Sequence, residues 1–176
     1  MCFCGGVWKG VSSVPSGNCR CFAGDMARPL VILDRDGVVN HDSPLYVRSA
    51  EAMGASGVVL GSGCVDAFNP KVVRASAGAV FHVPVVEAVQ LSEVKALGYR
   101  VLATSSHEQT NSMTLADADL TGAVCVVLGS EAHGVSQDNS ALVDGWIRIK
   151  HAGRAESLNV AMASTILSYE LARHRS

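Results

Sequence analysis

The chain has 176 residues, a length that suits one domain with one substantial hydrophobic core. Hydrophobic residues make up 48% of the chain and charged residues 17%, a composition that excludes a disordered protein. The net charge of −2 gives no overall basic bias, so a nucleic-acid partner would need a local patch, a partner subunit or another domain.

Residues 1–28 show no hydrophobic periodicity, and we expect them to form a poorly ordered tail. The tail carries two Cys-x-Cys pairs, a spacing that indicates zinc less strongly than Cys-x2-Cys does, so we expect no metal site. The cysteines concerned are Cys2, Cys4, Cys19 and Cys21. No apolar run approaches the roughly 20 residues of a membrane helix, and the tail is a poor signal peptide. We therefore expect a cytoplasmic protein that does not contact a membrane.

From residue 29 onward, strand patterns alternate with helix patterns. We expect strands at 29–34, 57–61, 82–86, 99–105 and 123–130, with a further one near the sheet edge at 145–150. We expect helices at 46–54, 69–80, 92–98 and 156–174. This alternation with short connections predicts one α/β domain over residues 29–176, with a mostly parallel sheet and helices on both faces. The last helix is apolar on nearly every face, so the fold or a second subunit must cover it.

Two polar segments lie where the predicted fold would bind a ligand. A buried strand runs into a turn that contains Gly129, Glu131 and Gly134. Glycines let a backbone approach a ligand closely, and open α/β sheets bind ligands at the carboxyl ends of their strands. Ser157 and Asn159 stand at the start of the last helix, where they could cap it or point at a ligand. An ordinary turn with a solvated Glu131 is the structural alternative.

Taken together, the motifs resemble the SpoU branch of the SPOUT methyltransferases. That family shows the stretches N-P-K-V-V-R-A-S-x-G, G-S-E-x-x-G and G-x-x-E-S-L-N-V in this order. Here they are NPKVVRASAG (69–78), GSEAHG (129–134) and GRAESLNV (153–160). The resemblance runs from about Val47 to Leu171 and is ordered and nearly verbatim.

The resemblance implies a C-terminal trefoil knot that holds S-adenosylmethionine. The family's cofactor-binding positions correspond here to Thr104, Leu128, Gly129, Gly134, Ile149, Ser157, Leu158 and Asn159. It also implies methyl transfer to a ribose 2'-hydroxyl of ribosomal or transfer RNA, by a homodimer with its last helix in the interface.

The resemblance further implies a central catalytic role for Arg48, together with Glu131, Ser157 and Asn159. Because arginine is normally a permanent cation, stabilising an alkoxide or holding a phosphate is easier for it than acting as a base. The plain alternative for Arg48 is a surface salt bridge.

The first motif departs from the family pattern. Asp42 stands where the family has asparagine, and Pro44 where it has glycine. Proline fixes φ and removes an amide donor, so this loop cannot be the family loop unchanged. A homologue that binds S-adenosylmethionine or RNA without catalysis is therefore an open alternative.

Residues 31–47 separately resemble the start of a haloacid-dehalogenase-type phosphatase. That resemblance would make Asp34 the nucleophile and Asp36 the acid/base, with Mg²⁺ bound between them. It covers far less of the chain than the methyltransferase resemblance does.

Overall fold

The computed structural model describes residues 30–33, 43–61, 64, 66–106, 109–129, 134–152 and 158–174. The expected N-terminal tail and its four cysteines lie outside these ranges. The strands are β1 (Leu30–Leu33), β2 (Gly57–Leu60), β3 (Val85–Glu87), β4 (Arg100–Thr104), β5 (Ser112–Thr114), β6 (Val124–Leu128) and β7 (Gly145–Arg148). The α-helices are α2 (Ser43–Ala52), α3 (Pro70–Ala75), α4 (Leu91–Ala96), α5 (Gln137–Ser140) and α6 (Val160–Arg173), and two short 3-10 helices are η1 (Ala79–Phe81) and η2 (Leu115–Asp117).

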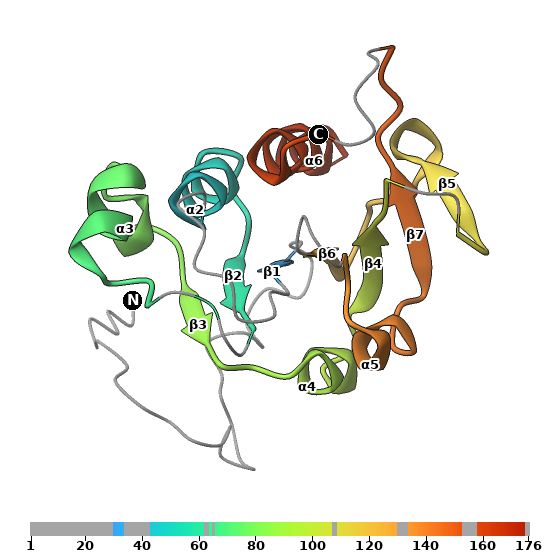
Figure 1. Ribbon diagram of the computed structural model, residues 1–176, viewed down its shortest axis with the longest axis horizontal. Coiled ribbons are helices and arrows are strands. Elements are labelled where there is room, and N and C mark those ends of the chain that lie inside the picture. The colour runs from blue at the N-terminus through green and yellow to red at the C-terminus, as the bar shows by residue number, and fades with distance from the viewer. Residues whose placement is uncertain are drawn as a thin grey trace.

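The strands form one sheet in the order β3-β2-β1-β6-β4-β7-β5, and every pairing among them is parallel. Helices cover both faces of this sheet, with α2, α3 and α6 on one side and α4 and α5 on the other (Figure 1). The predicted α/β class, the parallel sheet and the two helical layers are therefore confirmed. Parallel strands buried on both faces are rich in valine, isoleucine and leucine, as β6 is here.

Two hydrophobic clusters fill the spaces between the layers. The larger joins α2 and α6 to the sheet and includes Val47, Leu128 and Leu167. The smaller lies under α4 on the other face and includes Val94 and Val127. Neighbouring residues of β6 belong to different clusters because side chains alternate between the faces of a strand.

The predicted helix at 69–80 is shorter than expected. Asn69 caps α3 as predicted, its side chain accepting a hydrogen bond from the Lys71 amide, and Pro70 opens the helix. The α-helix then stops at Ala75, because Ala77 and Gly78 take left-handed φ angles of 52° and 84°. Left-handed residues end a helix rather than continue it, so the chain resumes as the separate turn η1.

Other predicted boundaries also change. Helix α2 begins at Ser43 rather than at 46, with Pro44 in its first turn, where a missing amide hydrogen costs nothing. Strand β7 lies next to the edge strand, as predicted, because the short strand β5 pairs with it on the outer side. Neither β5 nor α5 was predicted. Among the described residues, no helix is both long and apolar enough to span a membrane.

Candidate functional site

The carboxyl ends of the central strands lie side by side at one end of the sheet. Ala103 of β4 pairs with Val127 of β6, so Thr104 and Leu128 end their strands side by side. The Thr104 hydroxyl donates to the Val127 carbonyl at 3.4 Å, and the Ser105 amide donates to the Ile147 carbonyl of β7 at 3.1 Å. The backbone segments that follow β4, β6 and β7 therefore lie close together at these carboxyl ends.

Gly129 and Gly134, which flank residues 130–133 after β6, lie against each other. Gly129 is buried and follows β6 directly, and Gly134 takes a left-handed φ of 66°. A Cβ atom on Gly129 would lie 2.5 Å from the Gly134 carbonyl oxygen and 2.5 Å from the Val135 nitrogen. Backbone atoms cannot rotate out of the way as a side chain can, so only glycine permits this approach at position 129.

The start of the last helix contributes two predicted site residues. Asn159 is the N-cap of α6, where its side-chain oxygen accepts a hydrogen bond from the Ala161 amide at 2.8 Å. The capping role proposed from the sequence is thus confirmed for Asn159. Leu158 is half-buried beside it. Ile149, one residue past the end of β7, is also half-buried and packs against the larger core cluster.

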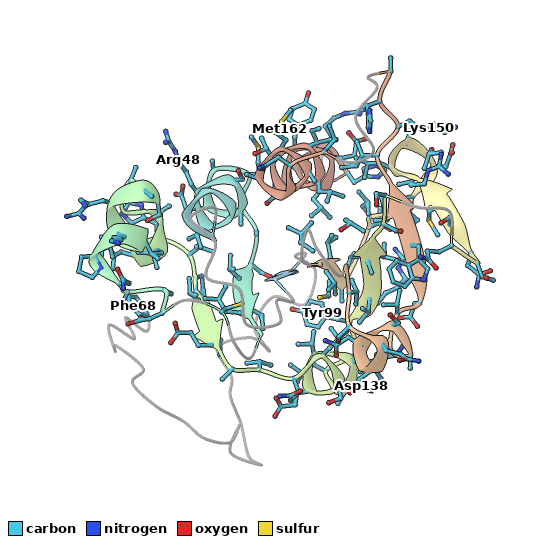
Figure 2. The ribbon with its side chains drawn as sticks, viewed as in Figure 1. Arg48, Phe68, Tyr99, Asp138, Lys150 and Met162 are labelled. Carbon is cyan, nitrogen blue, oxygen red and sulfur yellow. The ribbon has the colours of Figure 1, made fainter. Side chains whose placement is uncertain are left out.

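Arg48 lies on α2 rather than among the strand ends. Its neighbours Val47 and Ala50 are buried in the core, whereas the Arg48 side chain is exposed. Figure 2 shows Arg48 on the outer side of α2 and Met162 on the outer side of α6, both pointing away from the sheet. The two helices pack together, and the hydroxyls of Ser49 and Thr165 lie 2.9 Å apart between them.

Several predicted residues lie outside the described part of the chain. These are Glu131, Ser157, Asp34, Asp36 and Asp42. Within the described ranges, no group of three or more histidine, cysteine, aspartate or glutamate side chains could hold a metal ion.

Sequence reasoning missed a charged hydrogen-bond cluster at the other end of the sheet, near the amino ends of β4 and β7. We call this cluster the ionic clamp. Asp144 precedes β7, and its carboxylate accepts hydrogen bonds from the Val101 amide at 2.9 Å and from Lys95 Nζ at 2.8 Å. Partial burial opposes ionisation of Asp144, but these hydrogen bonds and the nearby positive charges outweigh it and lower the pKa of the carboxyl. The clamp fixes the register of β7 on β4. A lone aspartate before a strand gave no sequence signal for it.

The fold and the arrangement at the carboxyl ends of the strands define a class of protein. It is a parallel α/β domain in which the central strand β6 ends at a glycine that packs against backbone, and such sheets bind ligands at the carboxyl ends of their strands. The SpoU rRNA Methylase family model matches residues 45–169, and the chain belongs to that family.

Individual relatives agree with this assignment. The chain is 33% identical over 136 residues to the 23S rRNA (uridine(2479)-2'-O)-methyltransferase of Streptomyces viridochromogenes, a match that covers 73% of this chain and 47% of that enzyme. It is 32% identical over 151 residues to a Staphylococcus aureus (strain COL) protein assigned to the TrmH family of tRNA/rRNA methyltransferases, covering 83% of this chain and 60% of that protein. The chain thus spans about half to three-fifths of the length of these relatives.

Solved structures are similar over the same region. The AdoMet-bound rRNA methyltransferase from Sinorhizobium meliloti superimposes with a TM-score of 0.72 at 31% identity, over 84% of this chain and 56% of that one. The SpoU methyltransferase AviRb from Streptomyces viridochromogenes, in complex with AdoMet, gives a TM-score of 0.72 at 29% identity, over 85% of this chain and 61% of that one.

Proposed function

We propose that this protein transfers a methyl group from S-adenosylmethionine to a ribose 2'-hydroxyl of ribosomal or transfer RNA. The observation that carries the proposal is the glycine-dependent contact between Gly129 and Gly134, at the carboxyl end of β6 and inside the region matched by the family model. The similarity to rRNA methyltransferases, one of which methylates a 2'-oxygen, supports the same reaction.

Backbone groups would hold the cofactor. Main-chain atoms of Gly129, Gly134 and Val135 lie together at the end of β6, which suits a ligand recognised by peptide groups. We assign the walls of the pocket to Thr104, Leu128, Ile149, Ser157, Leu158 and Asn159. When bound, S-adenosylmethionine supplies a methyl group already activated by its sulfonium.

The protein must then align the ribose oxygen and manage its proton. We assign Arg48 to the substrate, where its fixed charge would grip a phosphate or stabilise the developing alkoxide. Glu131, Ser157 and Asn159 are assigned to orienting groups at the pocket. The Asn159 oxygen is used by its helix cap, so its amide nitrogen is the group we assign to the ligand.

A trefoil knot is part of the proposal. Strand β7 lies between β4 and β5, which are joined by residues 105–111. The chain after β5 returns to β6 through Leu115 and Leu120, which belong to the same core cluster as Leu167 of α6. Strand β7 comes later in the chain than β4, β5 and β6, yet it lies between β4 and β5. This position supports a path in which the end of the chain passes through the connection between β4 and β6, the arrangement that makes a knot.

We also propose a homodimer that uses α6. Three of its exposed side chains, Met162, Ile166 and Tyr169, are spaced four and three residues apart and so share one side of the helix. Met162 and Tyr169 are each 56% exposed, and a contiguous apolar stripe of this kind is typical of an interface.

Two measurements test the function. Titration calorimetry with S-adenosylmethionine should give a saturable heat. Tritiated cofactor should then label RNA at sites that resist alkaline cleavage, because a methylated 2'-oxygen cannot attack its phosphate. Arg48→Ala should bind the cofactor normally and lose transfer, whereas Arg48→Lys should retain part of it if charge alone suffices.

The outcomes separate the alternatives. Cofactor binding without transfer to any RNA would indicate a binding homologue altered at Asp42 and Pro44. Absence of cofactor binding, with Mg²⁺-dependent phosphate release that Asp34→Asn abolishes, would favour the phosphatase.

A further inference from the structure

Two phenylalanine rings are exposed beside α3. Phe68 is 38% and Phe81 65% exposed, and their ring centroids lie 6.2 Å apart at an interplanar angle of 36°. Figure 2 shows Phe68 at the outer margin of the sheet, next to α3 and β3. Large apolar side chains exposed as a contiguous pair indicate a contact surface more strongly than one exposed side chain does.

Positive groups accompany these rings. Lys71 and Arg74 stand one helical turn apart on α3, and both are exposed. Neither forms an ion pair with another residue in the described part of the chain. His82, directly after Phe81, is also exposed, and its Nδ1 lies 3.8 Å from a carboxylate oxygen of Glu51. We call Phe68, Lys71, Arg74, Phe81 and His82 the α3–η1 ridge.

Buried side chains and fixed turns hold the ridge in one conformation. Val72, Ala79 and Val80 are buried beneath it, and the Asn69 cap and the left-handed Gly78 fix its two turns. It also joins the helix that carries Arg48, because Glu51 is one turn further along α2 and faces His82. A ligand on the ridge would therefore lie next to the α2 helix.

We propose that the α3–η1 ridge is a docking surface for single-stranded RNA. Exposed rings offer stacking platforms for bases, and the exposed cations on the same ridge can neutralise phosphates, the two elements that single-strand binding sites combine. The ridge also supplies the local patch that a chain of net charge −2 needs to bind a polyanion. This inference rests on the proposed function, because it names the surface by which the methyl acceptor is held.

The test is fluorescence anisotropy of a short labelled single-stranded RNA, measured with the full chain over a range of salt concentrations. Phe81→Ala should weaken binding about five-fold or more with an unchanged salt slope, and Phe81→Trp should restore it. Lys71→Gln combined with Arg74→Gln should reduce the slope of log affinity against log salt by about 1.4, since each lost phosphate contact removes about 0.7.

Matched controls lie elsewhere on the surface. Leu97→Ala removes a side chain that is 52% exposed at the C-cap of α4, on the opposite face of the sheet, and Arg173→Gln removes a cation from the end of α6. Both should bind RNA as the wild type does. Calorimetry with S-adenosylmethionine, run on every variant, checks that the cofactor site is intact.

Three outcomes would overturn the inference. If the wild type binds RNA and the ridge variants bind it equally well, the ridge is not the docking surface, although the proposed function stands. If the ridge variants change the mass of the protein measured by light scattering, the ridge is an interface with a second copy of the chain. Absence of RNA binding by the wild type, with cofactor binding intact, would instead remove RNA as the substrate.

Discussion

Replacing Gly129 by alanine is the sharpest test of the pocket. The added Cβ would lie 2.5 Å from both the Gly134 oxygen and the Val135 nitrogen, with the Gly134 carbonyl carbon closer still. All three are backbone atoms, so the clash can be relieved only if the turn opens. Since the turn starts at the end of β6, opening it would displace the main-chain groups that we assign to S-adenosylmethionine.

The size of the effect follows from the cost of overpacking. Forcing a methyl group into a filled site costs about 1–3 kcal/mol. If the cofactor binds only when Gly129 and Gly134 lie close together, the free energy of overpacking is lost from the free energy of cofactor binding. At about 1.4 kcal/mol for each factor of ten, Gly129→Ala should weaken S-adenosylmethionine binding by roughly 5- to 150-fold.

Calorimetry of the variant gives the affinity, and urea unfolding reports whether the domain is still folded. Gly122→Ala is the control for an added Cβ, because that atom would meet no other atom within 4 Å, although Gly122, unlike Gly129, has a left-handed φ of 74°. It should lose stability through backbone strain and keep the wild-type cofactor affinity. A folded Gly129→Ala protein that binds the cofactor as tightly as the wild type would refute the reasoning.

Three further changes test the fold and the assembly. Asp144→Asn should destabilise the protein by about 1–2 kcal/mol at neutral pH in urea unfolding. Because folding lowers the pKa of Asp144, its contribution is present above about pH 4 and is lost as the pH falls further, so the gap in unfolding free energy between the two proteins should narrow with falling pH, and a constant gap would contradict this. Asn69→Ala should lower thermal stability by about 1 kcal/mol through loss of the α3 cap, whereas Asn69→Ser should retain most of it. Met162→Glu should halve the mass measured by light scattering, and an unchanged mass would argue against a dimer through α6.

Local patterns in the sequence predicted most of the described elements. The β6 segment is apolar at five successive positions, and no other arrangement hides such a run as well as a strand inside a parallel sheet. The capping role of Asn69 was also predictable. An asparagine side chain can accept a hydrogen bond from a free amide at the start of a helix, and the proline that follows it has a φ that suits the first helical position. Both signals depend only on neighbours along the chain.

Short and polar elements could not be predicted in this way. Strand β5 has three residues with half-buried side chains, and α5 is the polar stretch Gln137–Ser140. Neither contains enough residues to show a hydrophobic period. β5 is held by its pairing with β7, a contact between residues more than 30 positions apart in the chain.

The sequence by itself determined the α/β class, the parallel sheet, the family and the glycines of the candidate pocket, because each rests on residue type and local spacing. Only the tertiary structure decided that Gly129 packs against the Gly134 backbone, that β5 forms the edge strand outside β7 and that Arg48 points outward from α2. These features depend on which distant segments meet. That choice is made by burial and register over the whole domain, and no local pattern encodes it.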